Sequence, residues 1–219
     1  MRTAEKRADC KVNYKAVVFD LDGTLYCKKH LTLRICFHCL RSLNFIKNMQ
    51  AVRDVFKGTD FSTQEKLYEN FFNELACRCR KTPETAMDWY MNRFYPAFIH
   101  VLKKHYRPAA GVESLLHCLK AKNISAAVYS DYGFIPERLR AIGIDPSLFV
   151  FTISAESCGA LKPAPRPLSD LAKKMHCDSS RVLVIGDRDD TDGEAARKCG
   201  MKFAWYRGGD IDTFVRPML

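Results

Sequence analysis

The chain has 219 residues, of which 47% are hydrophobic and 27% are charged, and its formal net charge is +10. These proportions exclude a disordered, collagen-like or minimal disulfide-bonded chain. No apolar run approaches the roughly 18 to 20 residues that cross a bilayer, and the first 14 residues mix opposite charges without the apolar core of a secretory signal. We therefore expect a cytoplasmic protein that does not contact the membrane.

The first predicted element is a buried strand over residues 15–20, a short apolar run with β-branched residues. Residues 26–106 contain no such run and read as helix throughout. Residues 31–57 predict one long or two short helices. Ser62 followed by Glu65 predicts a capping box before a helix over 66–80.

The helical pattern continues to about Lys104. Thr82 and Pro83 predict a further helix start, and Pro96 should begin or kink the next helix. Beyond it, helical and strand patterns alternate. The helical patterns cover 111–122, 136–142, 167–176 and 192–199, and the strand runs cover 124–130, 148–153, 182–186 and 202–206.

This alternation is typical of an α/β fold with a doubly wound parallel sheet, Rossmann-like in outline. We expect a tail over 1–15, a core made of 16–25 and 107–219, and an inserted all-helical cap over 26–106. The charge follows the same division, with +3 on the tail, +7 on the insert and none on the core. A basic insert fits a lid that attracts small anions better than a nucleic-acid groove across the whole protein.

The ten cysteines have no secretory spacing, so we interpret them as free thiols. A structural zinc is the alternative, since Cys36, His38, Cys39, Cys77 and Cys79 are soft ligands. Both cysteine pairs lie in helical segments, and the second has a single intervening residue. Thiols are therefore the favoured interpretation.

Polar groups stand where open α/β sheets bind ligands, at the carboxyl ends of strands. Asp20 and Asp22 end the first strand and suit a nucleophile with a neighbouring acid or base. Ser130 and Asp131 end the second strand, and Lys162 stands before a later helix. Residues 186–192 hold four carboxylates, which repel one another unless a cation such as Mg²⁺ lies among them.

In this order the motifs resemble the haloacid dehalogenase superfamily, whose first motif is Asp-x-Asp-Gly-Thr. The resemblance implies an aspartyl-phosphate phosphatase acting on a small phosphorylated metabolite. Asp20 would be the nucleophile and Asp22 the general acid/base. The implied phosphate-binding residues are Gly23, Thr24, Ser130, Asp131 and Lys162, and the implied Mg²⁺ ligands are Asp20, Asp22 (through its carbonyl), Asp187 and Asp192.

Several alternatives stay open at this point. Asp190 could replace Asp192, although the sequence after Asp192 leads into a helix as it does in relatives. Asp131 departs from the family, where asparagine or a small residue is frequent. A phosphomutase of the β-phosphoglucomutase type would use the same Asp20 and Asp22, and a non-catalytic basic binding module is a more distant possibility. The sequence does not indicate which cap residues face the substrate, nor the oligomeric state.

Overall fold

A computed structural model describes residues 13–219. Its centre is a parallel five-stranded sheet in the order β3-β2-β1-β4-β5. The strands are β1 (Ala16–Phe19), β2 (Ser125–Ser130), β3 (Phe151–Ser154), β4 (Val182–Gly186) and β5 (Lys202–Trp205). All five predicted strands are present. The tail predicted over 1–15 lies outside the described residues except for residues 13–15.

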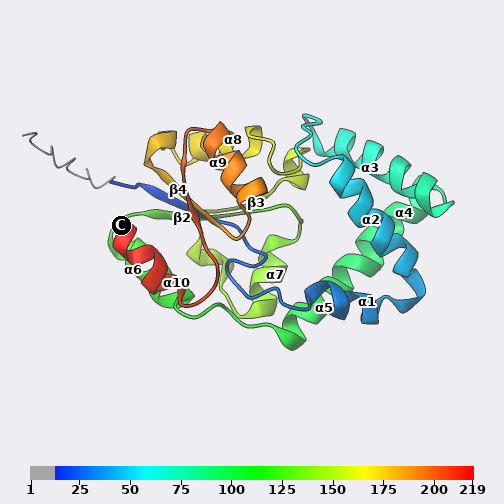
Figure 1. Ribbon diagram of the computed structural model, residues 1–219, viewed down its shortest axis with the longest axis horizontal. Coiled ribbons are helices and arrows are strands. Elements are labelled where there is room, and N and C mark those ends of the chain that lie inside the picture. Colours follow the sequence, from blue (N-terminus) through cyan, green and yellow to red (C-terminus); the bar gives the residue numbers. More distant parts are fainter. Residues whose placement is uncertain (1–12) are drawn as a thin grey trace, which may run out of the picture.

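Helices cover both faces of the sheet (Figure 1). They are α6 (Val112–Ala121), α7 (Ile135–Ile142), α8 (Arg166–Lys174), α9 (Glu194–Lys198) and α10 (Ile211–Val215). Helices α8 and α9 pack on one face, and α6, α7 and α10 pack on the other. The sequence pattern predicts the first four of these helices but not the five-residue α10.

The side chains of β1 explain why this strand reads as an unbroken apolar run. Val17 and Phe19 point to the face covered by α6, α7 and α10, whereas Ala16 and Val18 point to the face covered by α8 and α9. All four side chains are fully buried. A central parallel strand with helices on both faces shows no alternation of polar and apolar residues. The apolar run of β1 therefore follows from its position in the middle of the sheet.

Five helices and no strand form the insert between β1 and β2, a stretch that lies wholly within the described residues. They are α1 (Leu31–His38), α2 (Leu43–Val55), α3 (Gln64–Cys79), α4 (Pro83–Trp89) and α5 (Tyr95–His105). They lie together at one end of the sheet (Figure 1). The predicted α/β fold with an all-helical insert is thereby confirmed.

The helix starts within the insert differ in one detail from the prediction. Thr63, not Ser62, caps α3, because the Thr63 hydroxyl accepts the N–H of Lys66 at 3.3 Å. Ser62 has a positive φ of 72° and donates its N–H to Asp60. The prediction of a capping box at Ser62 was therefore wrong by one residue.

The other helix boundaries of the insert follow the sequence. Residues 31–57 form two helices rather than one, separated by a 3-10 turn over Leu40–Ser42. Thr82 caps α4 as predicted. A π-helical turn over Tyr90–Phe94 joins α4 to α5, and Pro96 lies in the first turn of α5. In the described part of the chain, no helix combines the length and the apolar character needed to span a membrane.

Candidate active site

Three carboxylates meet at the carboxyl edge of the sheet. Asp20 follows β1, and Asp187 and Asp192 follow the neighbouring parallel strand β4. One oxygen atom from each lies within 4.8 Å of the others. Among residues 13–219, no other set of three or more histidine, cysteine, aspartate or glutamate side chains is gathered this closely. The donors are all oxygen, as hard divalent cations require.

Lys162 supplies a buried positive charge beside these carboxylates. Its Nζ lies 2.8 Å from Oδ1 of Asp20 and 2.8 Å from Oδ1 of Asp192, and it also donates to the carbonyl of Tyr129. Burial alone lowers the pKa of Lys162, but Asp192 and Asp20 raise that pKa well above its ordinary value. The ammonium group therefore stays charged at the sheet edge.

Asp20 is buried, and the charge of Lys162 only partly offsets the effect of burial and of the neighbouring carboxylates on it. Burial raises the pKa of Asp20 to about 7; Lys162 opposes this rise, while the carboxylates of Asp192 and Asp22 add to it. Burial also raises the pKa of Asp192. Thr24 donates its hydroxyl to Asp20 Oδ2 at 3.2 Å. Lys162 alone does not neutralise this group, so a divalent cation would be stabilised among the three carboxylates.

The structure separates Asp192 from Asp190. Asp192 is 4% exposed and contacts Lys162. The Asp190 side chain is 53% exposed and pairs with Lys57 and Arg188 on the surface. The preference for Asp192 as the second acidic position agrees with this placement, although its role as a metal ligand stays a prediction.

Asp22 is held by a residue that sequence reasoning missed. Arg138 donates Nη2 to both carboxylate oxygens of Asp22, and the Tyr26 hydroxyl donates to Oδ1. Burial works to raise the pKa of Asp22, but the Arg138 charge and these hydrogen bonds bring that pKa below its ordinary value. Asp22 is therefore held as a carboxylate in this structure.

Arg138 itself is fully buried on α7. Its Nη1 donates to Ser130 Oγ at 3.2 Å and to the carbonyl of Tyr132 at 3.1 Å, and its guanidinium lies 4.5 Å from the ring centre of Phe98 in α5. One signal could have revealed it. Arg138 occupies the apolar stripe of α7 together with Ile135, Leu139 and Ile142, where a charged residue needs a buried partner.

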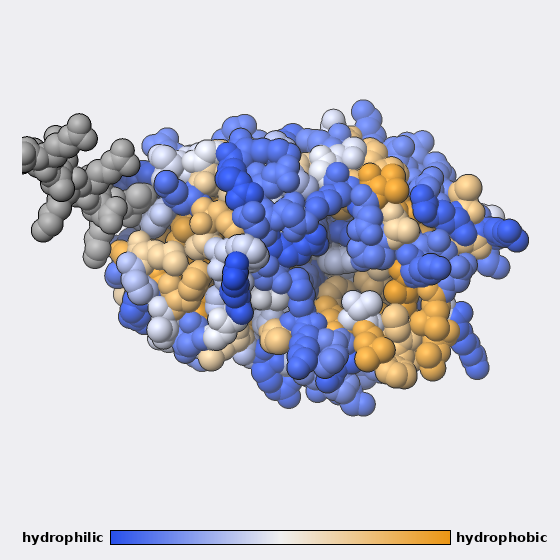
Figure 2. Space-filling model, in the orientation of Figure 1, coloured by the Kyte–Doolittle hydropathy of each residue, from blue (hydrophilic) through white to orange (hydrophobic). Residues whose placement is uncertain are grey.

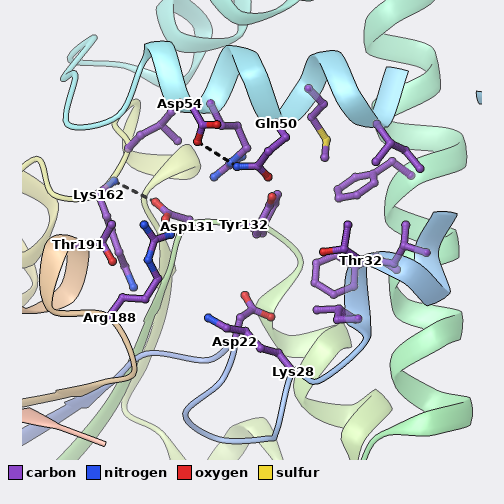
Figure 3. Close-up of a pocket in the computed structure, with 18 of the residues that line it drawn as sticks. Asp22, Lys28, Thr32, Gln50, Asp54, Asp131, Tyr132, Lys162, Arg188 and Thr191 are labelled. Carbon is purple, nitrogen blue, oxygen red and sulfur yellow. Dashed lines mark hydrogen bonds between the residues drawn. The ribbon is translucent and has the colours of Figure 1, made fainter. Parts of the chain in front are cut away.

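Only two of the five residues predicted to bind phosphate line the pocket. These are Lys162 and Asp131, whereas Gly23, Thr24 and Ser130 do not line it. The Ser130 hydroxyl is fully buried and lies 3.3 Å from Asp22 Oδ2. The Asp131 carboxylate accepts the main-chain N–H of Lys162 at 2.9 Å, and so supports the loop that carries this lysine (Figure 3).

Gly23 has a structural reason to be glycine. Its φ is +101°, and a Cβ at this position would lie 2.2 Å from Oδ2 of Asp187. The close approach brings the turn after Asp22 against the loop after β4. Lys28, from the same turn region, pairs with Asp187 at 2.5 Å. Any larger residue at position 23 would displace Asp187.

A pocket of about 740 Å³ opens between the sheet edge and the helical insert. Asp20, Asp22 and Lys162 lie at its core side, and α1, α2 and α5 contribute its other walls. The surface is visibly hollowed between the two parts of the molecule, with hydrophilic residues on the core side and hydrophobic ones gathered over α1 (Figure 2). The site is therefore enclosed by residues from both parts of the chain.

A buried glutamate connects the core to the insert, and sequence reasoning missed it as well. Glu156, just after β3, is 2% exposed and accepts from Arg53 Nη1 at 2.6 Å. The hydroxyls of Tyr90 and Tyr95 also donate to its carboxylate. These partners lie 61 to 103 positions away from Glu156 in the sequence, so no local sequence pattern predicts their contacts with it.

The cysteines do not gather into a ligand set. In the part of the chain that the structure describes, nine cysteines are free thiols, and no group of three metal ligands includes any of them. The zinc alternative at Cys36, His38, Cys39, Cys77 and Cys79 therefore finds no support. Cys10 lies outside the described residues.

Known proteins share this fold. A 2-haloacid dehalogenase from Pseudomonas syringae has a TM-score of 0.63 at 20% identity, covering 88% of this chain and 86% of that one. A β-phosphoglucomutase from Clostridium difficile has a TM-score of 0.63 at 18% identity, covering 93% and 87%. A protein described as a predicted phosphoglycolate phosphatase from Haemophilus somnus has a TM-score of 0.59 at 22% identity, covering 90% and 87%. At these identities the similarity establishes the fold.

The sequence comparisons establish the family as well as the fold. A D-glycero-β-D-manno-heptose-1,7-bisphosphate 7-phosphatase from Rhodopseudomonas palustris is 33% identical over 97 residues, which are 44% of this chain and about half (49%) of that relative. The profile of the haloacid dehalogenase-like hydrolase family matches residues 17–206, and so contains Asp20, Lys162 and Asp192. The chain therefore belongs to the haloacid dehalogenase-like hydrolases.

Proposed function

We propose that this protein is a Mg²⁺-dependent phosphatase that hydrolyses a small phosphate monoester through an aspartyl phosphate on Asp20. The observation that carries the proposal is the contact of Asp20 with Lys162, inside the cluster that Asp187 and Asp192 complete. A buried carboxylate, a buried ammonium group and a cluster of carboxylate oxygens thus lie together at the floor of one pocket, which supports a nucleophile, a fixed cation and a metal site there. The phosphatase activity named for the Rhodopseudomonas palustris relative supports the same chemistry.

The residues present fit a magnesium ion. Asp20, Asp187 and Asp192 would hold it, together with the main-chain carbonyl of Asp22. Their fit rests on the donor set, three carboxylates whose oxygen atoms lie within 4.8 Å of one another. When bound, the ion would neutralise charge on the phosphoryl oxygens and on Asp20.

Asp20 and Asp22 divide the chemistry between them. An oxygen of Asp20 attacks phosphorus as the bond to the leaving oxygen breaks, and protonated Asp22 gives its proton to that oxygen. A water molecule then attacks the aspartyl phosphate and gives a proton to Asp22, so that free phosphate leaves and Asp20 is regenerated. Lys162 opposes the rise that burial causes in the pKa of Asp20, and its ammonium group would also contact the phosphoryl oxygens.

The Arg138 contact bears on this division of roles. Asp22 as held here is a carboxylate, the form that accepts a proton from water. To act as the acid, Asp22 must take up a proton and loosen its contact with Arg138. We therefore assign the base role to Asp22 when it contacts Arg138 as observed. We assign the acid role to protonated Asp22 after this contact has loosened.

The test uses phenyl phosphate as a generic substrate. We expect purified protein to release free phosphate only when Mg²⁺ is present. Asp20→Asn should abolish turnover and Asp192→Asn should lower it at least a hundredfold, whereas Asp190→Asn, which alters an exposed neighbour, should retain activity within about threefold. Full activity in Asp20→Asn would refute the nucleophile assignment. Equal losses in the Asp190 and Asp192 variants would refute the assignment of Asp192.

The phosphomutase alternative stays a prediction, because the similarity of this chain to a β-phosphoglucomutase structure, at 18% identity, shows the fold alone. An assay of free phosphate with a hexose 1-phosphate as the substrate separates the two activities. A mutase would convert a hexose 1-phosphate to the 6-phosphate with little release of free phosphate. A non-catalytic binding module would show no turnover with any ester.

A further inference from the structure

The pocket is larger than a phosphate group requires. Its volume of about 740 Å³ lies within the range of roughly 300 to 1,000 Å³ that encloses drug-sized ligands. Asp20 and Lys162 occupy one end, and the pocket continues along α2 away from them. The substrate therefore has room for a leaving group of considerable size, and the walls beyond the phosphate site indicate its chemistry.

The face of α2 that lines the pocket changes from apolar to charged along the helix. Leu43, Ile46 and Met49 come first, and they are spaced three residues apart so that they share one face. Gln50, Arg53 and Asp54 follow on the same face, with Lys57 just beyond the helix end. In Figure 3, Asp54 lies nearer to Lys162 than Gln50 does. The charged end of α2 thus lies over the catalytic carboxylates.

An ion pair shows which end of α2 lies nearest to the carboxylates. Lys57, just past its C-terminus, lies 2.5 Å from Asp190 in the loop that also carries Asp192. The N-terminal end of α2, with Leu43 and Ile46, is therefore the end remote from the phosphate site. The pocket grades from ionic at the metal site to apolar at its far end.

The remaining walls of the far end are also apolar. Leu31, Ile35 and Cys36 line it from α1. Phe94 and Phe98 line the pocket nearer the core, since their ring centres lie 5.9 and 5.8 Å from that of Tyr132. Ile35, Phe94 and Phe98 are each at most 5% exposed. Hydroxyl groups of a sugar placed against these side chains would lose water without gaining hydrogen bonds, at a cost of about 1 to 3 kcal/mol each.

Polar groups at the far end are few. Thr32 stands at that end in Figure 3, on the side opposite to Lys162. Lys47 lines the pocket as well, but it is exposed to solvent. These two side chains can serve one or two polar atoms, but they do not make a sugar-binding surface.

Several cations that line the pocket are paired within the described part of the chain: Lys28 with Asp187, Arg53 with Glu156, and both Arg188 and Lys57 with Asp190. Lys47 also lines the pocket and is exposed to solvent. Apart from Lys162 beside the carboxylates, only Arg53 among these cations is buried, and Glu156 balances its charge. Arg53 keeps one buried amino group, Nη2, without a partner in the described structure, and this donor suits a single uncharged acceptor near mid-pocket.

We propose that the leaving group is a largely apolar, ring-sized alcohol, so that the substrate is a hydrophobic phosphate monoester and not a sugar phosphate. This inference rests on the proposed function and specifies its substrate class. The walls formed by α1, α2 and α5 would bind the apolar body, while Asp20 and Lys162 act on the phosphate.

The test compares esters of similar intrinsic reactivity. 2-Phenylethyl phosphate, glycerol 3-phosphate and glucose 6-phosphate all release a primary alcohol, so differences in kcat/KM report on the pocket. We expect kcat/KM for the phenylethyl ester to exceed that for the two polar esters at least tenfold. A kcat/KM for glucose 6-phosphate equal to or above that for the phenylethyl ester would overturn the inference and leave the phosphatase assignment standing. No hydrolysis of any ester with Mg²⁺ would overturn both.

Variants at the apolar end of the pocket test which wall causes the preference for the phenylethyl ester. Leu43→Ser and Ile46→Thr should lower kcat/KM for the phenylethyl ester three- to thirtyfold, with glycerol 3-phosphate changed less than twofold. Leu33→Ser is the matched control, because Leu33 lies on α1, is 54% exposed and does not line the pocket. Thermal melts establish that each variant is folded. An unchanged preference in folded Leu43→Ser and Ile46→Thr would contradict the assignment of this wall.

Discussion

At the scale of single residues, Arg138 shows how a buried charge organises the site. It joins both oxygens of Asp22 to Ser130 Oγ and to the main chain after β2. The guanidinium forms a fork whose Nη2 holds the Asp22 carboxylate while its Nη1 holds Ser130 Oγ and the Tyr132 carbonyl. A single ammonium group cannot serve both sets of partners in this way. Arg138 does not line the pocket, so we regard it as a positioning residue for Asp22.

Arg138→Met should therefore lower kcat about tenfold or more and change KM little. It should also lower the free energy of unfolding by about 3 to 5 kcal/mol, because it leaves Asp22 as an unpaired, partly buried charge. Urea unfolding and steady-state kinetics with phenyl phosphate measure the two effects. Arg138→Lys keeps the charge without the fork and should recover stability better than kcat.

The double variant Arg138→Met/Asp22→Asn separates pairing from general packing. Removal of the unpaired Asp22 charge should restore part of the lost free energy of unfolding, giving a coupling energy of about 1 to 3 kcal/mol. Strictly additive losses in unfolding free energy would show that Arg138 acts through its packing against Phe98 alone.

At the scale of elements, Glu156 ties the insert to the sheet. It follows β3, and its carboxylate is shared by Arg53 of α2, by Tyr90 of the π-helical turn and by Tyr95 of α5. The guanidinium of Arg53 also lies 3.9 Å from the ring centre of Tyr132, in the loop after β2. One buried carboxylate thus sets the position of α2, the helix that forms the graded wall of the pocket.

Glu156→Gln should lower the free energy of unfolding by about 3 to 5 kcal/mol, because it leaves the buried Arg53 without a counter-charge. Amide hydrogen exchange should also speed up in α2. The control is Glu113→Gln, since the Glu113 side chain is 87% exposed and should change stability by less than about 0.5 kcal/mol. Equal effects in the two variants would mean that the tie contributes nothing.

At the scale of the whole molecule, only part of the positive charge of the insert lies at the pocket. Lys28, Lys47, Arg53 and Lys57 line it, whereas the other basic residues of the insert do not. The Arg53 charge is balanced by Glu156. The expectation that the insert attracts small anions stays a prediction.

Magnesium should stabilise the whole fold. A cation bound to the folded state only adds about 2.7 kcal/mol at a concentration 100 times its dissociation constant. For a domain of this size each 1 kcal/mol raises Tm by about 2 to 4 °C. We thus expect millimolar Mg²⁺ to raise Tm by several degrees and EDTA to reverse the rise.

The matched variants locate the ion. Asp192→Asn should abolish the rise in Tm, and Asp190→Asn should keep it, since Asp190 lies outside the carboxylate cluster. A rise that survives in Asp192→Asn would place the stabilising ion elsewhere. This measurement needs no substrate and is independent of turnover.

The sequence by itself determined the sheet and the polar groups at its edge. The apolar runs mark the buried parallel strands, and Asp20, Lys162 and Asp192 stand directly after or close to strand ends, where local order already implies convergence. The helices of the insert were equally readable, apart from the one-residue shift at Thr63. These features depend on local propensity and on periodicity, which a sequence displays directly.

Only the tertiary structure decided what surrounds these groups. The partner of Asp22 is 116 positions away and that of Glu156 is 103 positions away. The apolar stripe of α7 indicates that Arg138 needs a buried partner, but the sequence identifies neither pair of partners. The same holds for the position of α2, whose apolar face is visible in the sequence but whose placement over the carboxylates depends on the buried contact of Arg53 with Glu156. Catalytic chemistry is encoded by short motifs, whereas the choice of leaving group depends on walls from distant segments that only folding brings together.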